Sequence, residues 1–251
     1  MKIRSIDVIG AGGTGSHFIP DAARIRAYHP DMMDATFAVW DGDHYEENNL
    51  LRQMCRKSDA EGKANKAEVM AMEVAPFGAC SAHPEYIKGP EDLYDTLFHY
   101  LRAQKDETEP ALSVFVLAVD NDATRKIIYD AIDEVPDLNV AIIDPANDYW
   151  TGHVNLWVRM DGNAPFLHPR EKYEQLKSPT DRNPADKGCS KEVESTPQLI
   201  TANKMAATLS LHILISLLSE ESITEEVMFD LRLFTAGAIG EWVKSDKEGD
   251  N

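Results

Sequence analysis

The chain has 251 residues, of which 43% are hydrophobic and 27% are charged, an ordinary globular composition. This composition excludes collagen-like, coiled-coil and mucin-like proteins. It carries 25 Lys and Arg against 43 Asp and Glu, a formal net charge of −18. A field of this sign repels phosphate backbones and anionic lipid, so we expect no nucleic-acid partner and no membrane partner.

The cysteines and the apolar stretches predict a cytoplasmic protein. Cys55, Cys80 and Cys189 are an odd number without CxxC spacing, so they predict neither a disulfide framework nor a four-cysteine zinc site. The first residues contain no apolar core of a secretory signal. The longest apolar stretch, residues 205–218, is shorter than the roughly 20 residues that span a bilayer.

Buried strands alternate with helical periodicity over the first 150 or so residues. Strands are predicted at 6–9, 36–40, 113–119 and 140–143, and helices at 15–28, 63–74 and 123–135. Asn121 or Asp122 is expected to cap the last of these helices. The alternation implies βαβ units, and therefore an α/β fold with a Rossmann-like, doubly wound, mostly parallel sheet. Right-handed crossovers place the carboxyl ends of these strands on one edge, where ligands bind.

The pattern changes after Asp144. Residues 152–160 alternate as an antiparallel strand does, and residues 161–195 form a long polar segment with little periodicity. A helix is predicted from Thr196 to about Ser219, and a strand at 227–234. We therefore expect an antiparallel C-terminal extension of the sheet.

A glycine-rich loop follows the first strand and opens the first helix. It reads Gly10-Ala11-Gly12-Gly13-Thr14-Gly15-Ser16. Glycines let a backbone approach phosphates, and a helix start supplies free N–H groups with partial positive charge. The GxGxxG pattern of Gly10, Gly12 and Gly15 fits NAD, FAD or ATP, and a tight turn without a ligand is the alternative.

Asp41 ends the second strand, near the place where an acidic residue accepts the ribose hydroxyls of a nucleotide. Such a carboxylate suits a dinucleotide and ATP equally. The alternative is a carboxylate that is simply solvated.

Residues downstream of Asp41 distinguish a triphosphate from a dinucleotide. Arg52 follows a run of polar amides, Lys63 and Lys66 stand at the start of the next helix, and Asp120 ends a later strand. A dinucleotide enzyme has no need of these cations, whereas a triphosphate does. An acidic strand end such as Asp120 can hold Mg²⁺.

Five motifs in this order resemble the ThiF/MoeB/HesA family, the E1-like adenylyltransferases that activate ubiquitin-like proteins and sulfur carriers. The family pattern is GxGGxGS, DxD, NLxRQ, a lysine and DNxxxR. It is found here at residues 10–16, at Asp41 and Asp43, at residues 49–53, at Lys66, and at Asp120-Asn121 with Arg125. The chain is most similar to the ThiF-type proteins of PRTRC gene clusters, in residues 65–69, Tyr149-Trp150, Gly152, Cys189-Ser190 and Asn203.

The resemblance implies a role for each matching residue. Gly10, Gly12, Gly13 and Gly15 would line the phosphate side of ATP, and Asp41 would take the ribose. Asn49, Arg52, Gln53 and Lys66 would surround the triphosphate, with Arg52 and Lys66 compensating charge on the departing pyrophosphate. Asp120 would hold Mg²⁺. The alternative for Lys63 is a solvated lysine, because Lys66 matches the family better.

The same resemblance implies the reaction. The C-terminal carboxylate of a small ubiquitin-like or sulfur-carrier protein would attack the α-phosphate of ATP, giving an acyl-adenylate and pyrophosphate. Such a carboxylate is already ionised near neutral pH, so the attack needs no general base. Family members are usually homodimers, and we expect one here.

Cys189 matches a cysteine that passes the activated carboxylate to sulfur in some relatives. Lys187 and Lys191 flank it and would lower the pKa of the thiol if they point inward. The alternative is an idle thiol in a loop. Cys55 and Cys80 are expected to be packing residues, and no zinc is expected.

The resemblance divides the chain into four parts. These are an ATP-binding Rossmann-like part at 1–160, a crossover loop at 161–195, a helix and strand that complete the same domain at 196–244, and a tail at 245–251. Two alternatives to the adenylyltransferase stay open. A non-enzymatic nucleotide-binding scaffold would account for the missing N-terminal arginine of the family, and an NAD-linked oxidoreductase would use only the glycine loop and Asp41.

Overall fold

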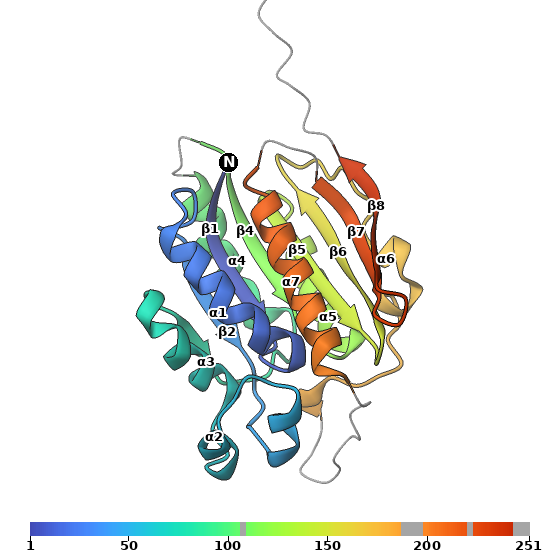
Figure 1. Cartoon of the computed structure of the whole chain (residues 1–251). Coiled ribbons are helices and arrows are strands. Elements are labelled where there is room, and N and C mark those ends of the chain that lie inside the picture. The colour runs from blue at the N-terminus through green and yellow to red at the C-terminus, as the bar shows by residue number, and fades with distance from the viewer. Residues whose placement is uncertain (106–108, 187–197, 220–222, 243–251) are drawn as a thin grey trace, which may run out of the picture.

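One eight-stranded mixed sheet forms the centre of the molecule, with helices on both faces (Figure 1). The computed structural model describes residues 1–105, 109–186, 198–219 and 223–242. The strand order is β3-β2-β1-β4-β5-β6-β7-β8. The expected α/β, Rossmann-like sheet with an antiparallel C-terminal extension is confirmed.

The parallel half of the sheet contains β1 (Lys2–Ile9), β2 (Thr36–Trp40), β3 (Ser81–His83), β4 (Ala111–Leu117) and β5 (Val140–Asn147). The chain leaves β1 on one side to reach β2 and returns on the other side at β4. This reversal between β1 and β4 is the switch point at which doubly wound sheets bind ligands, outside the carboxyl ends of the strands. The glycine loop follows β1 at this point.

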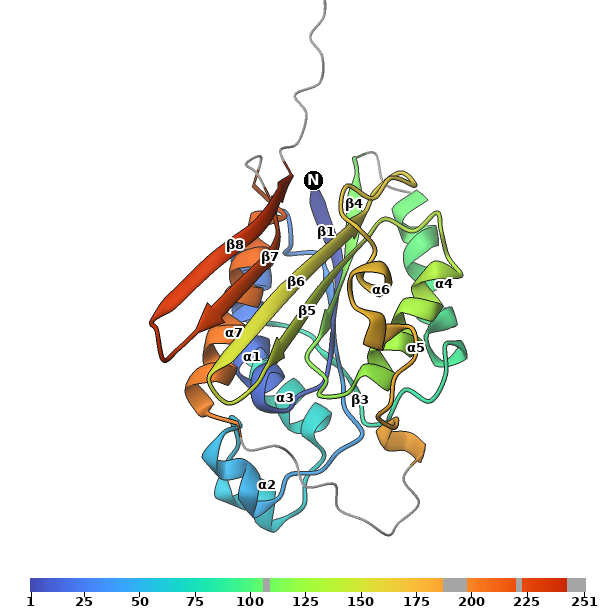
Figure 2. The same cartoon turned by 90° about the vertical axis from the view of Figure 1, so that its right-hand side faces the viewer.

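Helices cover both faces of the sheet, as the side view shows (Figure 2). One face carries α1 (Gly13–Tyr28), α3 (Lys66–Val74) and α7 (Ile200–Ser216), and the other carries α4 (Glu91–Lys105), α5 (Asp122–Asp133) and the short α6 (Pro169–Lys172). The short helix α2 (Lys57–Glu61) lies at the end of the molecule where β1 and β4 finish (Figure 1). Among the described residues, no helix is long and apolar enough to cross a membrane.

The C-terminal extension consists of β6 (Thr151–Arg159), β7 (Ile223–Asp230) and β8 (Thr235–Trp242), each antiparallel to its neighbour. The strand predicted at 227–234 has the wrong bounds, because β7 ends at Asp230 and the rest of that range is the turn of the β7–β8 hairpin. Asp230 accepts a hydrogen bond from the backbone N–H of Arg232, and Phe234 has a φ of 52°, so the chain turns there instead of continuing.

Side-chain caps set the helix starts beside the carboxyl edge. Asn65 accepts from the N–H of Glu68 and starts α3, so the helix predicted from residue 63 begins three residues later, after Lys63 with its φ of 48°. Asn121 caps α5 by accepting from the N–H of Thr124, which decides between the two expected caps. Helix α1 begins at Gly13, two residues before the predicted start.

The elements β3, β8, α2 and α4 were not predicted from the sequence. Strand β3 has three residues, too few to show a period, and β8 contains Gly237 and Gly240 in place of an apolar run. Helix α4 has a readable signal, since Leu93, Leu97 and Tyr100 are its buried positions at helical spacing. The expected loop at 161–195 contains α6 and two single 3₁₀ turns in its described part.

A buried carboxyl group joins the strands to α4. Asp7 on β1 is 0% exposed, and it accepts hydrogen bonds from the indole nitrogen of Trp40 (3.0 Å) and the hydroxyl of Tyr100 (2.8 Å). Burial raises the pKa of Asp7 from 3.8 to about 6, although both hydrogen bonds oppose this rise. Trp40, the residue before Asp41, is thus fixed by its hydrogen bond to a carboxyl group inside the core.

We expect Asp7→Asn to remove a pH-dependent loss of stability. Between pH 4 and pH 6 the folded state keeps a proton on Asp7 that the unfolded chain has released, so the free energy of unfolding falls as the pH rises. The free energy of unfolding decreases by about 3 kcal/mol over this range and does not recover above pH 6. Urea denaturation at several pH values should show this step in the wild type and in the exposed-carboxylate control Asp161→Asn, but not in Asp7→Asn. The same step in Asp7→Asn would contradict the assignment.

Candidate functional site

The glycine loop is shaped by close backbone contacts at two of its glycines. Gly10 has a φ of +98°, which favours glycine, and its N–H donates to the carbonyl of Trp40. A Cβ at Gly15 would lie 1.9 Å from the carbonyl oxygen of Gly10. These two glycines are therefore required by the loop itself, with or without a ligand.

The other two glycines face side chains. A Cβ at Gly13 would lie 2.4 Å from the amide nitrogen of Asn203 on α7, whereas a Cβ at Gly12 would meet nothing nearer than Gln53 at 4.0 Å. Gly12 is the N-cap of α1, and among the described residues no side chain caps this helix. The start of α1 thus combines backbone N–H groups that no described side chain caps with a helix dipole that favours anions.

Asp41 closes the loop from the end of β2. Its carboxylate accepts from the N–H of Ala11 (2.7 Å) and from the N–H of Asp43 (2.8 Å). Burial raises the pKa of Asp41, and the neighbouring Lys66 opposes this rise. Because a carboxylate has about four acceptor positions, two remain for hydroxyl groups of a ligand.

Lys66 and Asp43 form an ion pair beside Asp41. The ammonium of Lys66 lies 3.0 Å from a carboxylate oxygen of Asp43, and Lys66 is only 6% exposed. Asp43 also accepts from the hydroxyl of Tyr86. Asn65 fixes this corner by donating to the carbonyls of Asp41 and Asp43. Lys63, in contrast, is exposed.

The segment that contains Arg52 packs against the start of α1. The carbonyl of Arg52 contacts the ring of His17 (3.1 Å), and the N–H of Met54 donates to Ser16 (3.0 Å). Burial lowers the pKa of His17, although its contact with the Arg52 carbonyl opposes this change. The Arg52 guanidinium donates to Gln198, which follows the crossover segment (2.9 Å).

Asn49 and Gln53 flank Arg52 in different ways. Asn49 is buried and accepts from the N–H of Glu46, so its oxygen stabilises the 3₁₀ turn at Glu47–Leu51. Gln53 is 6% exposed, and its side-chain oxygen has no partner among the described residues. The amide nitrogen of Gln53 thus lies near Gly12, whereas Asn49 acts on the backbone.

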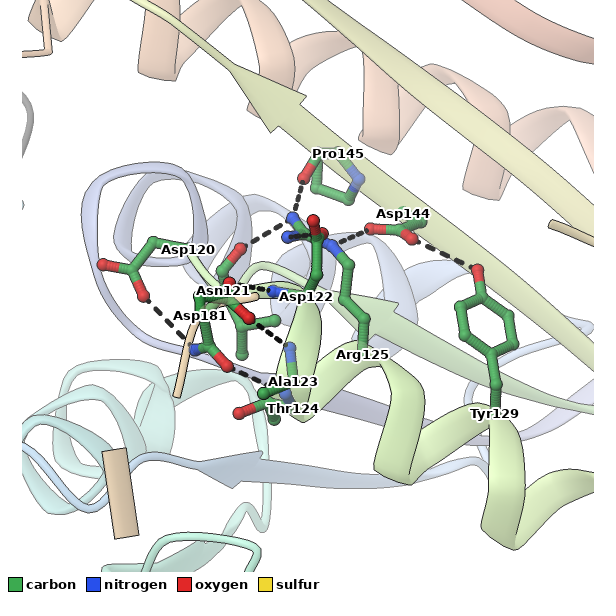
Figure 3. Close-up of polar contacts among 11 residues, drawn as sticks. Asp120, Asn121, Asp122, Ala123, Thr124, Arg125, Tyr129, Asp144, Pro145 and Asp181 are labelled. Atoms are coloured by element: carbon green, nitrogen blue, oxygen red, sulfur yellow. Dashed lines mark hydrogen bonds and ion pairs between the residues drawn. The ribbon is translucent and has the colours of Figure 1, made fainter. Parts of the chain in front are cut away.

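Asp120 is exposed at the end of β4, next to the start of α5 (Figure 3). Its carboxylate accepts one long hydrogen bond, 3.4 Å, from Asn121. Burial raises the pKa of the Tyr86 hydroxyl, the contact with Asp43 adds to this rise, and the charge of Asp120 makes a smaller contribution. Asp120 and the Asp41–Lys66 corner thus belong to one edge of the sheet.

One aspartate of the crossover segment, Asp181, stabilises the start of α5. Asp181 of the crossover segment accepts from the N–H groups of Asp122 (2.6 Å) and Ala123 (3.0 Å), so it occupies the anion-binding end of the helix (Figure 3). Asn183, two residues later, donates to the carbonyl of Ile87 (2.8 Å). The described part of the crossover segment is therefore tied across the carboxyl edge at two points.

Arg125 joins the ends of β4 and β5 (Figure 3). Its guanidinium donates to Asp144 (2.8 Å) and to the carbonyls of Val119 (2.7 Å) and Pro145 (3.1 Å). Tyr129 donates to the other oxygen of Asp144 (3.1 Å). Burial opposes the charge of Arg125, but Asp144 outweighs it and the pKa of Arg125 is raised.

A magnesium ion fits the donor set only together with a phosphate ligand. Among the described residues, no group of three or more His, Cys, Asp or Glu side chains could hold a metal ion. Mg²⁺ is commonly bound by one or two carboxylates and completes its shell with water and substrate phosphates, which matches the single exposed Asp120.

The cysteines divide into two groups. Cys55 and Cys80 are partly buried against the core, as expected of packing residues, and burial raises the pKa of both thiols, that of Cys80 to about 11. Cys189 lies outside the residues that the structure describes.

The structure gathers most of the predicted site residues at one edge and adds four that sequence reasoning did not select. These are Asn147, Asp181, Gln198 and Asn203. Asn203 alone had a signal, because it stands in a segment similar to the PRTRC branch. The other three come from segments without a readable motif.

Comparisons with known proteins support the fold. No protein-family model matches the sequence, and no curated protein matches it. Solved structures do match, among them PaaA, at a TM-score of 0.59 and 14% identity, and E. coli MccB with ATP, at 0.59 and 17%. Each match covers 94% of this chain and 63% of that one.

A further match is the microcin C7 biosynthetic enzyme MccB in complex with N-formylated MccA, at a TM-score of 0.56 and 15% identity. It covers 94% of this chain and 64% of that one. The chain therefore spans less than two thirds of the length of these neighbours, and at such identities the likeness establishes the fold alone.

We expect Arg125→Met to destabilise the protein by about 3–5 kcal/mol, because it leaves Asp144 buried without its cation. The double variant Arg125→Met/Asp144→Asn removes both charges and should regain a large part of that loss. Urea denaturation of the two variants and of the wild type measures the difference. A double variant at least as unstable as Arg125→Met would show that the ion pair is not the cause.

Proposed function

We propose that the protein is an ATP-dependent adenylyltransferase that activates the C-terminal carboxylate of a small protein or peptide. The observation that carries the proposal is the meeting, at one switch point, of an uncapped glycine-loop helix with Asp41, Lys66, Arg52 and Asp120. The structural neighbours PaaA and MccB, which are E1-like adenylyltransferases, support it, as does MccB crystallised with ATP. This is the class that the motifs resemble.

Each described residue has a place in this proposal. Asp41 would bind the ribose hydroxyls with its remaining acceptor positions, beside the N–H of Ala11. Gly12 and Gly13 at the start of α1 would face the phosphates. Arg52, Gln53 and Lys66 would surround the triphosphate, and Asn49 would support the turn that presents Arg52.

The residues would act by position and charge. A C-terminal carboxylate is ionised at neutral pH, so the proposed reaction needs no residue to remove a proton. Its oxygen attacks the α-phosphorus, and the bond to the bridging oxygen of pyrophosphate breaks. Arg52 and Lys66 would stabilise the charge that moves onto pyrophosphate, and Asp120 would hold Mg²⁺, which supplies charge neutralisation.

A groove beside the glycine loop suits an extended partner. It has a volume of about 770 Å³, begins at Asn147 and Asp148, and runs along the end of β7 and the start of β8 past the half-exposed Met228 and Ile239. Exposed apolar patches of this kind mark protein interaction sites. MccB was crystallised with MccA, and here we propose a small ubiquitin-like or sulfur-carrier protein, with the enzyme as a homodimer.

Cys189 offers a second step to the proposed reaction. Its thiolate would attack the acyl carbon of the adenylate, forming a thioester and releasing AMP. A non-enzymatic scaffold would bind ATP and leave it intact, whereas an NAD-linked oxidoreductase would leave Arg52 and Asp120 without a role.

We expect Arg52→Ala and Asp120→Ala to abolish ATP–pyrophosphate exchange, with losses of at least about 100-fold, because each removes a charge that acts on the triphosphate or its metal. The exchange is measured with small β-grasp proteins that end in Gly-Gly, and with short peptides, as carboxylate donors. Lys63→Asn is the matched control, since Lys63 is exposed and asparagine tolerates its positive φ.

Exchange in both alanine variants at the rate of Lys63→Asn would contradict the proposal. Circular dichroism of each variant separates a loss of chemistry from a loss of fold. Binding of ATP without exchange by any donor would favour the scaffold.

A further inference from the structure

Asn203 is a buried amide whose nitrogen has no acceptor. The side chain lies on α7, is 0% exposed, and has no partner for its Nδ2 among the described residues. This nitrogen is pressed against Gly13, where a Cβ would lie only 2.4 Å away. A buried donor without an acceptor is costly, so its presence at a loop of this kind points to a ligand.

The neighbouring hydrogen bonds fix which end of the Asn203 amide faces the loop. The carbonyl oxygen of Asp148 can only accept, and the side-chain nitrogen of Asn147 donates to it (3.3 Å). The same nitrogen donates to Oδ1 of Asn203 (3.0 Å), and Thr14 donates to the oxygen of Asn147 (3.1 Å). Oδ1 of Asn203 therefore faces Asn147, and Nδ2 is the atom at Gly13.

The contrast with α5 shows that the start of α1 is left open. At α5 the first N–H groups are taken by Asn121 and Asp181, whereas α1 has no side-chain cap among the described residues and no acidic residue in its first turn. An oxygen ligand at the start of α1 would meet both the helix dipole and the amide of Asn203.

The position of Asp41 indicates which oxygen of a nucleotide would lie at the start of α1. Asp41 binds the N–H of Ala11, and Gly13 is two residues further, at most about 7 Å of chain. A nucleotide whose ribose lies at Asp41 would therefore bring its first phosphate, attached directly to the ribose, to Gly13.

We infer that Asn203 is a ligand-binding residue of the site, whose Nδ2 donates to an α-phosphate oxygen of the bound nucleotide. The inference rests on the proposed function. It also explains Gly13, because a side chain there would separate the amide from the phosphate. Asn147 then acts as a positioning residue that orients the Asn203 amide.

Titrations with adenosine, AMP and ATP·Mg²⁺ test this contact, because only adenosine lacks the α-phosphate. The variants are Asn203→Leu, which keeps the shape, and Asn203→Asp, which replaces the donor by a charge. The matched control is Ser210→Ala, a buried residue of the same helix whose hydroxyl bonds only its own helix backbone.

We expect the AMP-to-adenosine affinity ratio to fall roughly 10-fold to 100-fold in Asn203→Leu, and further in Asn203→Asp, with adenosine binding unchanged within about 2-fold. The control should keep the wild-type ratio. A folded Asn203→Leu that keeps this ratio would overturn the inference, whereas a wild type that binds no ATP would instead overturn the proposed function.

A second measurement uses the wild-type protein and therefore does not depend on whether a variant folds. The side-chain ¹⁵N–¹H signals of Asn203 in the wild type should move downfield on addition of AMP and stay in place on addition of adenosine. Equal responses to both ligands would contradict the contact with the phosphate.

Discussion

The hydrogen bond from the N–H of Ala11 to the carboxylate of Asp41 is the contact on which the rest of the site depends. It joins the glycine loop after β1 to the end of β2 at 2.7 Å, and the N–H of Gly10 strengthens the link by donating to the carbonyl of Trp40. The carbonyls of Asp41 and Asp43, at the same strand end, accept hydrogen bonds from Asn65. These bonds position the start of α3, and with it the ammonium of Lys66 beside Asp43. One strand end thus arranges the loop and a cation together.

Because the protein is strongly negative, only groups close to the site can attract an anionic ligand. With a net charge of −18, the molecule as a whole repels anions, so an anionic ligand has to be bound by specific groups at short range. The start of α1, with no acidic residue in its first turn, provides such a place, and Lys66 lies beside Asp41. At α5 the opposite holds, because Asp181 already neutralises the helix start and uses it to fasten the crossover segment.

Much of the fold was predictable because it follows from periodicity. The strands at 36–40 and 113–119, the cap at Asn121 and the loop after β1 all carry local signals, and the structure contains them with small shifts. The turn at residues 231–234 and the strand β8 were not predictable, since Gly237 and Gly240 dilute the apolar pattern. The site divides likewise: Asp41, Lys66 and Asp120 stand in motifs, but the contacts of Asp181, Gln198 and Asn147 join residues more than 50 positions apart. Such pairs leave no trace in a local pattern.

Calorimetric titration of the wild-type protein with ATP·Mg²⁺ and, in parallel, with NADH tests the central claim most directly. Both ligands suit a glycine loop followed by an acidic strand end, but only the triphosphate uses Arg52, Lys66 and Asp120. The account predicts saturable binding of ATP·Mg²⁺ that weakens in Asp120→Ala, and no binding of NADH. Saturable binding of NADH without any response to ATP would contradict it, because the edge of the sheet would then be a dinucleotide site.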